Sequence, residues 1–323
     1  MNRKIGDLAD GRVTEASRGD AKRSHAPFAA RRSSLLDPAV LASIGRLDLV
    51  ARTVVEGFLA GLHRSPFSGL SQEFAQHRQY IPGDDPRHID WRVYARTDRL
   101  YVKEFEDETN APVRLLLDAS GSLGYAPRGV SKFDYARFLL AALAYLAVRQ
   151  NDRVGFVAFN DEARERLRAS GGQRHLHTIL AALGRLRPAG HTRLGPIMLR
   201  EASQWKRRGL VVVVSDLYDE PPEVVGAITR IRRAHHDVIV FHLLDRAEKL
   251  MEHDGLYEFR DLETGQTLVA DSSRVRQSYV ERMAGMCSYY RREFGRAGVD
   301  YAELDTAEPL ERALAIYLQR RAK

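Results

Sequence analysis

Three short segments of the sequence carry oxygen-bearing side chains that could together bind a metal ion. The first is Asp118-Ala119-Ser120-Gly121-Ser122, the second contains Thr192, and the third begins with Ser215-Asp216. Two carboxylates and three hydroxyls are oxygen donors, the class of ligand that Mg²⁺ prefers and that also suits Mn²⁺. We therefore predict a site for Mg²⁺, with Mn²⁺ as a compatible ion, formed by Asp118, Ser120, Ser122, Thr192 and Asp216.

A simpler interpretation stays open at this point, because Asp and Ser also stabilise tight turns. Asp118 and Ser120 could form an Asx-type turn, and Asp216 could begin another. A D-x-S-x-S string alone is weak evidence for a binding site. The positions of the three segments favour the metal site, since each lies at the expected end of a strand or the start of a helix, where open α/β sheets bind ligands.

The elements that would position these side chains alternate between strand and helix. Short runs rich in Val, Leu and Phe predict strands over 113–117, 153–159, 210–214 and 238–244. Helical spacing of apolar residues predicts helices over 132–148, 176–186, 195–205 and 223–235. This alternation is typical of a doubly wound, mostly parallel sheet covered on both faces, so the predicted fold class is α/β and Rossmann-like.

We predict four segments along the chain. Residues 1–35 are polar and without periodicity, which indicates a disordered basic tail. Residues 36–110 form an N-terminal segment with a helical stretch over 37–62 and a strand over 100–105, and residues 111–245 form the β–α domain. Residues 246–323 form an extension with a hairpin of strands 256–262 and 267–270 joined by Glu263-Thr264-Gly265-Gln266, followed by a helix, a strand at 299–304 and a last helix.

Two groups of residues resemble known families. The D-x-S-x-S string with Thr192 and Asp216 resembles the metal-ion-dependent adhesion site of von Willebrand factor A domains. A second group consists of the segments Gly69–Phe74, Arg78–Arg92, Ala95-Arg96, Val102–Phe105 and Gly298–Thr306. These segments carry a more specific resemblance, to the bacterial family called domain of unknown function 58, and it covers about residues 60–320.

The resemblance implies binding rather than catalysis. In the adhesion-site family the first Asp and both Ser hold the metal from one loop, Thr holds it from a second loop, and the last Asp often acts through water. A carboxylate of a partner protein then completes the coordination. For this chain the resemblance implies a Mg²⁺-dependent protein-binding adaptor that works with a MoxR-type AAA+ ATPase in chaperone-like remodelling or maturation of a client protein, whose acid would bind the metal.

The sequence departs from the adhesion-site pattern at two positions. His191 precedes Thr192 where a second glycine is usual, and Leu123 stands where methionine is frequent. Neither change removes a ligand. We expect His191 to narrow the access of a partner's acid.

Charged residues also occur together outside the three ligand segments. The turn-forming segment around Pro82-Gly83 carries paired carboxylates and nearby arginines, and we expect a charge network there, with a docking surface as the alternative. The residues of that possible surface are Asp84, Asp85, Arg87, Asp90 and Arg92. Glu248 is expected to be an ordinary helix or loop charge.

Enzymatic activity finds little support in the sequence. No G-x-x-x-x-G-K-[ST] and no G-x-S-x-G motif occurs, so we expect neither a nucleotide hydrolase nor a usual α/β-hydrolase. The alternative function is a metal-dependent hydrolase that uses the same five ligands and a water nucleophile. That alternative lacks an evident general base.

The amino-acid composition limits the partners and the cellular compartment that we expect for this protein. The net charge of +7 is concentrated in residues 1–35, which hold eight basic and four acidic residues, so no nucleic-acid partner is expected. A single cysteine, Cys287, excludes an internal disulfide and a Cys-rich zinc site and indicates a reducing compartment. The longest apolar run, 138–148, is too short for a membrane span, and no signal peptide is recognised. We expect a cytoplasmic protein.

Overall fold

The computed structural model describes residues 37–62, 77–80, 94, 100–103, 111–127, 129–252 and 254–321. The predicted tail at 1–35 lies outside these residues, and so do all residues of the possible docking surface: Asp84, Asp85, Arg87, Asp90 and Arg92. Within the N-terminal segment, β1 (His77–Gln79) pairs antiparallel with β2 (Tyr101–Lys103), and the latter lies inside the predicted strand.

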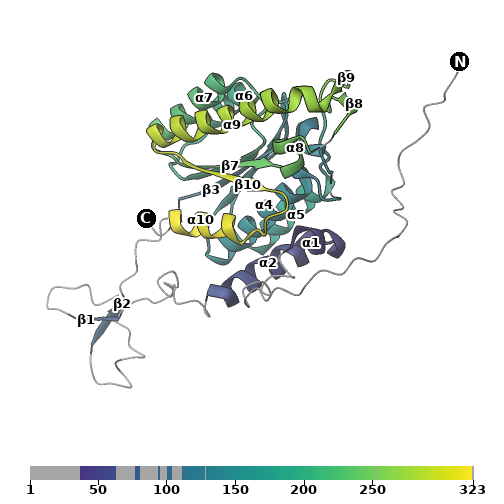
Figure 1. Cartoon of the computed structure of the whole chain (residues 1–323). Coiled ribbons are helices and arrows are strands. Elements are labelled where there is room, and N and C mark those ends of the chain that lie inside the picture. Colours follow the sequence, from purple (N-terminus) through teal and green to yellow (C-terminus); the bar gives the residue numbers. More distant parts are fainter. Residues whose placement is uncertain are drawn as a thin grey trace, which may run out of the picture. The chain divides into compact units, whose positions relative to one another are not determined.

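A six-stranded sheet organises the rest of the described chain (Figure 1). Its order is β10-β7-β6-β3-β4-β5, and every neighbouring pair is parallel except β4 and β5. The strands are β3 (Val113–Asp118), β4 (Val154–Phe159), β5 (Ala163–Ser170), β6 (Leu210–Ser215), β7 (Asp237–Leu244) and β10 (Asp300–Asp305). The predicted α/β class with a mostly parallel sheet is therefore confirmed.

Helices cover both faces of this sheet, because its central strands are buried on both sides. Leu115 and Leu117 of β3 face one core, whereas Leu116 faces the other. The first core lies under α1 (Pro38–Ile44), α2 (Leu47–Leu62), α4 (Lys132–Arg149), α5 (Gln173–Arg185) and α10 (Glu311–Arg321). The second lies under α6 (Leu194–Ala202), α7 (Pro221–Arg233) and α9 (Ser272–Ala297) (Figure 1).

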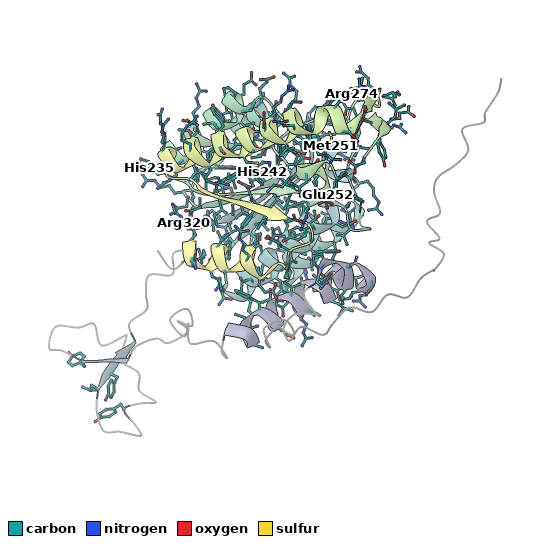
Figure 2. All side chains as sticks on the ribbon, in the orientation of Figure 1. His235, His242, Met251, Glu252, Arg274 and Arg320 are labelled. Atoms are coloured by element: carbon teal, nitrogen blue, oxygen red, sulfur yellow. The ribbon has the colours of Figure 1, made fainter. Side chains whose placement is uncertain are left out.

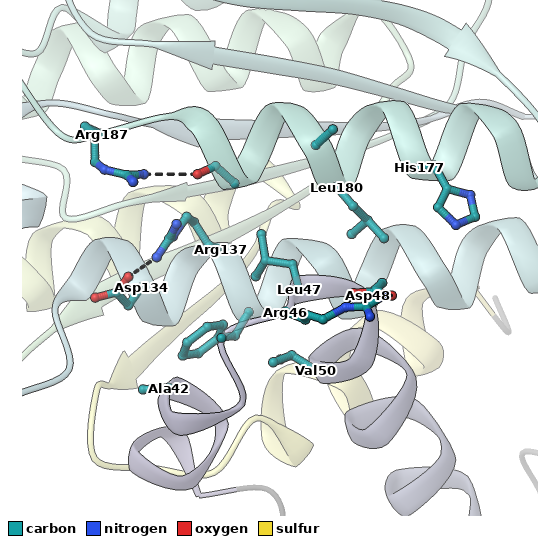
Figure 3. Close-up of a pocket in the computed structure, with 14 residues that line it drawn as sticks. Ala42, Arg46, Leu47, Asp48, Val50, Asp134, Arg137, His177, Leu180 and Arg187 are labelled. Carbon is teal, nitrogen blue, oxygen red and sulfur yellow. Dashed lines mark hydrogen bonds and ion pairs between the residues drawn. The ribbon is translucent and has the colours of Figure 1, made fainter.

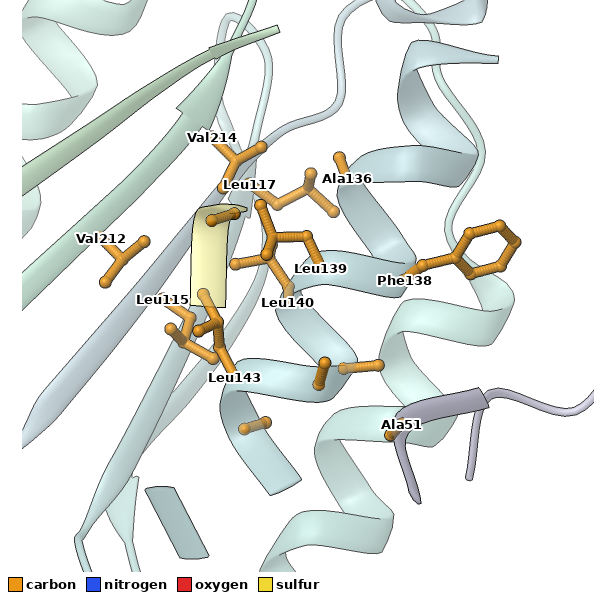
Figure 4. Close-up of a cluster of buried hydrophobic side chains, with 14 of the residues drawn as sticks. Ala51, Leu115, Leu117, Ala136, Phe138, Leu139, Leu140, Leu143, Val212 and Val214 are labelled. Atoms are coloured by element: carbon orange, nitrogen blue, oxygen red, sulfur yellow. The ribbon is translucent and has the colours of Figure 1, made fainter. Parts of the chain in front are cut away.

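Helix α4 is the most enclosed helix of the first core. Fourteen of its 18 residues are buried, as expected for a helix that is apolar on all sides. Figure 4 shows Leu139, Leu140 and Leu143 beside the sheet residues Leu115 and Val212. The N-terminal helix α2 packs on α4 through Ala51 and its neighbours, so α4 lies between the sheet and α2.

The chain reverses its direction of winding at the centre of the sheet. After β3 it enters α4 on one face, and after β6 it enters α7 on the other face. Such a switch point leaves a crevice at the carboxyl ends of the two strands, which is where α/β sheets bind ligands. Asp118 ends β3, and Asp216 directly follows β6.

The C-terminal part contributes both to the sheet and to a separate hairpin. Strand β10 pairs with β7 at one edge of the sheet, so the sheet extends beyond the predicted segment 111–245. The predicted hairpin is confirmed as β8 (Leu256–Arg260) and β9 (Thr267–Asp271), which pair antiparallel. The short helix α8 (Arg246–Leu250) connects β7 to this hairpin.

Candidate metal centre

The structure brings the five predicted ligand residues together at the carboxyl edge of the sheet. Asp118, at the end of β3, is the centre of their hydrogen bonds. Its Oδ1 accepts from the backbone N–H of Ser120 at 2.9 Å, and its Oδ2 accepts from the hydroxyl of Thr192 at 3.1 Å. The hydroxyls of Ser120 and Ser122 lie 3.0 Å apart, at the start of the 3-10 helix η2 (Gly121–Gly124).

The loop that carries Thr192 is bound directly to the loop that carries the two serines. The N–H of Gly121 donates to the carbonyl of Gly190 at 2.9 Å, and the N–H of Ala189 donates to the carbonyl of Ala119 at 2.9 Å. Asn160, which follows β4, donates its side-chain N–H to the carbonyl of Ala189 at 2.9 Å. Backbone contacts therefore fix the distance between the first and second ligand segments.

The third ligand segment, which contains Asp216, is held by its neighbours. Ser215 donates its hydroxyl to Asp118 Oδ2 at 2.6 Å and accepts from the N–H of Leu217 at 2.9 Å. The carbonyl of Asp216 lies 2.9 Å from Nε2 of His242, a fully buried residue of β7 (Figure 2). Burial lowers the pKa of His242 to about 4, so this ring is neutral at physiological pH.

A buried cation, which the sequence analysis did not anticipate, lies beside Asp216. Lys132 at the start of α4 is fully buried, and its Nζ donates to Asp216 Oδ2 at 2.7 Å and to Glu248 Oε1 at 2.8 Å. Burial opposes the charged form of Lys132, yet the charges of Asp216 and Glu248 raise its pKa above the ordinary value. Lys132 therefore contributes a positive charge to the site through its two ion pairs.

The expectation that Glu248 is an ordinary charge is wrong. Its side chain is only 12% exposed because it closes a capping box with Asp245 at the start of α8, and this geometry directs it toward Lys132. Nothing in the sequence around Glu248 indicates a partner 116 residues away. The capping-box spacing of Asp245 and Glu248 was the available local signal, although it predicts a helix start rather than a role in the site.

The charges and donors of the site fit a divalent cation. Burial, reinforced by the charge of Asp216, raises the pKa of Asp118 to about 7, so a cation near the two buried carboxylates would favour their ionised forms. Lys132 compensates one of the charges of Asp118, Asp216 and Glu248, so two negative charges remain when all three are ionised. In addition, Asp216 Oδ1 is buried without a hydrogen-bond partner among the described residues.

Hydroxyl oxygens would have to complete such a coordination shell. No cluster of three His, Cys, Asp or Glu side chains in the described part of the chain is arranged to hold a metal. The serine and threonine hydroxyls beside Asp118 supply the missing oxygen donors. This donor set suits Mg²⁺ or Mn²⁺ better than zinc, which prefers His and Cys.

Glu263, at the tip of the hairpin, also reaches the site. Its Oε2 accepts from the backbone N–H of Thr192 at 3.3 Å and lies 3.6 Å from Nδ1 of His191. Burial raises the pKa of Glu263, and the hydroxyl of Ser122 opposes this rise. Glu263 lies in the predicted hairpin turn, but no local signal in the sequence indicates that this turn folds over the ligand loops.

A cavity of about 580 Å³ lies between the α1–α2 junction and helices α4 and α5 (Figure 3). None of the five predicted ligand residues lines it. Its charged groups include two internal ion pairs, Arg46 with Asp48 and Arg137 with Asp134. The cavity is therefore separate from the candidate metal centre.

Comparison with known proteins gives one family and several more distant likenesses. A family model described as "Protein of unknown function DUF58" matches residues 76–286, which is more than half of the chain. An uncharacterized protein of Mycobacterium tuberculosis is 29% identical over 244 residues, which cover 72% of this chain and 74% of that protein.

Two solved structures have a similar arrangement of elements. The conserved hypothetical protein BatB from Bacteroides thetaiotaomicron is 17% identical, with a TM-score of 0.47 over 66% of this chain and 98% of that chain. The VWA domain of SpRpn10 is 11% identical, with a TM-score of 0.40 over 64% of this chain and 93% of that chain.

Among the described residues, no helix is both long and apolar enough to cross a membrane.

Proposed function

This chain belongs to the DUF58 family, and we propose that it is a protein-binding adaptor whose contact with a partner depends on a divalent metal ion. The ion is Mg²⁺, with Mn²⁺ as a substitute, and its ligands are Asp118, Ser120, Ser122, Thr192 and Asp216. The observation that supports this proposal is the convergence of two buried carboxylates with three hydroxyl side chains at the switch point of the sheet.

Each residue group has a distinct part in this proposal. Asp118 holds the three ligand loops together through its hydrogen bonds to Ser120, Thr192 and Ser215. Lys132 neutralises part of the charge of Asp216, which leaves the site less negative toward an incoming acid. A bound Mg²⁺ supplies the positive charge that attracts a carboxylate oxygen of another protein.

The partners follow from the family resemblance rather than from the geometry. We propose a MoxR-type AAA+ ATPase as the partner, with a client protein that presents an acidic side chain, and a role in remodelling or maturing that client. We place the chain in the cytoplasm, where its unpaired and buried Cys287 is compatible with a reducing environment. No nucleic acid is included in this proposal.

The test is capture of a purified MoxR-type ATPase on the immobilised full chain, in Mg²⁺ and in EDTA. We expect the wild-type chain to capture the ATPase in Mg²⁺ but not in EDTA. We expect no capture by Asp118→Asn in either condition. The matched control is Asp237→Asn, because Asp237 is exposed at the opposite end of β7. Capture that persists in EDTA, or in Asp118→Asn folded as judged by circular dichroism, would contradict the metal bridge.

The same proteins separate binding from hydrolysis. A panel of phosphoesters should show no turnover by the wild-type chain in Mg²⁺. Steady turnover that disappears in Asp118→Asn and persists in Asp237→Asn would favour the metal-dependent hydrolase instead.

A further inference from the structure

We infer that Glu263 closes the candidate metal centre from within the chain and would take the place of a partner's carboxylate when an ion is bound. The inference rests on the proposed function, because it names how access to that same site is controlled. Glu263 lies far along the chain from the other ligand segments, and only the fold of the β8–β9 hairpin brings it there.

The turn that carries Glu263 has a fixed shape. Asp261 accepts from the N–H of Glu263 at 2.8 Å and from the hydroxyl of Thr264 at 2.7 Å. Gly265 adopts the left-handed conformation with φ 73° and donates its N–H to the carbonyl of Asp261 at 2.8 Å. A turn held by this many internal bonds presents Glu263 in one direction.

The turn also lies directly on the loop that carries the two serine ligands. A Cβ atom at Gly121 would be 2.3 Å from the carbonyl oxygen of Leu262, so only glycine permits this approach. Gly121 stands between Ser120 and Ser122. The hairpin tip therefore contacts the ligand loop through backbone as well as through the Glu263 side chain.

The carboxylate of Glu263 faces the second ligand segment. Its Oε2 accepts the N–H of Thr192 at 3.3 Å and lies near His191, whereas Oε1 is buried without a hydrogen-bond partner among the described residues. A buried carboxylate oxygen without a partner is costly. A cation held by Ser122 and Thr192 would supply that partner.

The hairpin is separate from the six-stranded sheet, so its displacement would break no strand pairing of that sheet. Its strands are largely exposed, with Leu256 at 75% and Leu268 at 67%, and among the described strands they pair only with each other. A two-stranded hairpin has little stability of its own. Its base is attached at Gly255, whose φ of 109° suits glycine and whose carbonyl accepts the N–H of Ser272 at 2.9 Å. A partner's acid could thus replace Glu263 without unfolding the sheet.

The experiment measures Mn²⁺ binding to the full chain by isothermal titration and by the water-proton relaxivity of bound Mn²⁺. The variants are Glu263→Gln and, as a matched control, Glu258→Gln, which makes the same change at an exposed position of the same hairpin. We expect Glu263→Gln to weaken Mn²⁺ binding at least about tenfold, the lower end of the loss when a supporting ligand is removed. Relaxivity should rise because water replaces the carboxylate, and added acetate should lower it again.

The outcomes separate this inference from the proposed function. Suppose that Glu263→Gln matches Glu258→Gln in affinity, relaxivity and response to acetate, while Asp118→Asn loses Mn²⁺ binding. The inference about Glu263 is then wrong, and the proposed metal site is supported. If Asp118→Asn binds Mn²⁺ as the wild type does, the proposed site is wrong, and the inference falls with it. Thermal unfolding of each variant excludes loss of fold as the cause.

Discussion

At the scale of single residues, the buried ammonium of Lys132 sets the charge of the candidate metal centre. It is the partner of both Asp216 and Glu248, and all three side chains are withdrawn from solvent. Removal of one member of a buried charge network leaves the others uncompensated, which costs far more than loss of an exposed ion pair.

We therefore predict that Lys132→Met lowers the free energy of unfolding by about 3 to 5 kcal/mol in the absence of metal. Mg²⁺ should restore part of this loss, because a bound cation would compensate the charge of Asp216 that Lys132 no longer neutralises. Urea unfolding with and without Mg²⁺ measures both effects. The control is Arg137→Met on the same helix, whose ion pair with Asp134 is partly exposed and should be worth about 1 kcal/mol or less. Equal effects of the two variants would contradict the role of Lys132.

His236 gives a prediction for the dependence of stability on pH. Burial, aided by the positive charge of Arg114, lowers the pKa of His236 below its ordinary value of 6.5. Below pH 6.5 the unfolded chain binds a proton that the folded chain resists, so stability falls as the pH falls. His236→Asn should reduce this slope between pH 6.5 and 5 by up to about 1.4 kcal/mol per pH unit. Urea unfolding of the wild type and of His236→Asn between pH 6.5 and 5 measures the two slopes. Equal slopes would contradict this prediction.

The five residues that the sequence predicts as ligands do lie together, because the ends of strands can be located from local pattern, but their role as metal ligands stays a prediction. Asp118 and Asp216 each follow a run of apolar residues that only a strand explains. Lys132, Glu248 and Glu263 could not be found this way. Their partners lie many residues away, and only the packing of α4, α8 and the hairpin around the switch point brings them together.

At the scale of elements, the contact between the hairpin turn and the serine loop depends on Gly121. We predict that Gly121→Ala displaces the turn, because the new Cβ would overlap the carbonyl of Leu262. Cleavage by trypsin after Arg260 should become several-fold faster. Gly226→Ala is the control, since a Cβ added there would meet no other part of the described structure within 4 Å. Equal cleavage rates of wild type and Gly121→Ala would show that the turn does not rest on this loop.

Strand β5 is one of the elements that were not predicted from the sequence. It alternates half-buried residues such as Leu167 with exposed arginines such as Arg166 and Arg168, as expected for a strand at the edge of a sheet. Runs of apolar residues indicate strands that are buried on both faces, such as β3 and β6. They do not indicate a strand that is covered on one face only. The observed bounds of α6 and α7 also differ from the predicted ones by a few residues, because hydrophobic spacing does not mark the first and last turns of a helix.

At the scale of the whole molecule, the helices at 38–62 and the last helix share the core of the β–α sheet. Leu41 of α1 and Tyr317 of α10 are both fully buried in the same cluster as α4. The predicted boundaries of the four segments stay a prediction, but the sharing of a core indicates that these helices unfold together with the sheet.

This cooperation can be measured with a single substitution. Leu41→Ala should lower the free energy of unfolding of the whole chain by about 2 to 5 kcal/mol in one transition. Val40→Ala, at a position 39% exposed on the same helix, should have little effect. A separate early transition in Leu41→Ala, with an unchanged main midpoint, would show that α1 and α2 are an independent attachment.

Binding of Mn²⁺ to the wild-type chain, measured by isothermal titration, tests the candidate metal centre most directly. The proposal predicts a single site, lost in Asp118→Asn and in Asp216→Asn and kept in Asp237→Asn at the opposite end of the sheet. Mg²⁺ should compete for that site, because the donors are hard oxygen atoms. Absence of binding by the folded wild-type chain, or binding that survives both site substitutions, would contradict the metal centre and the adaptor function that rests on it.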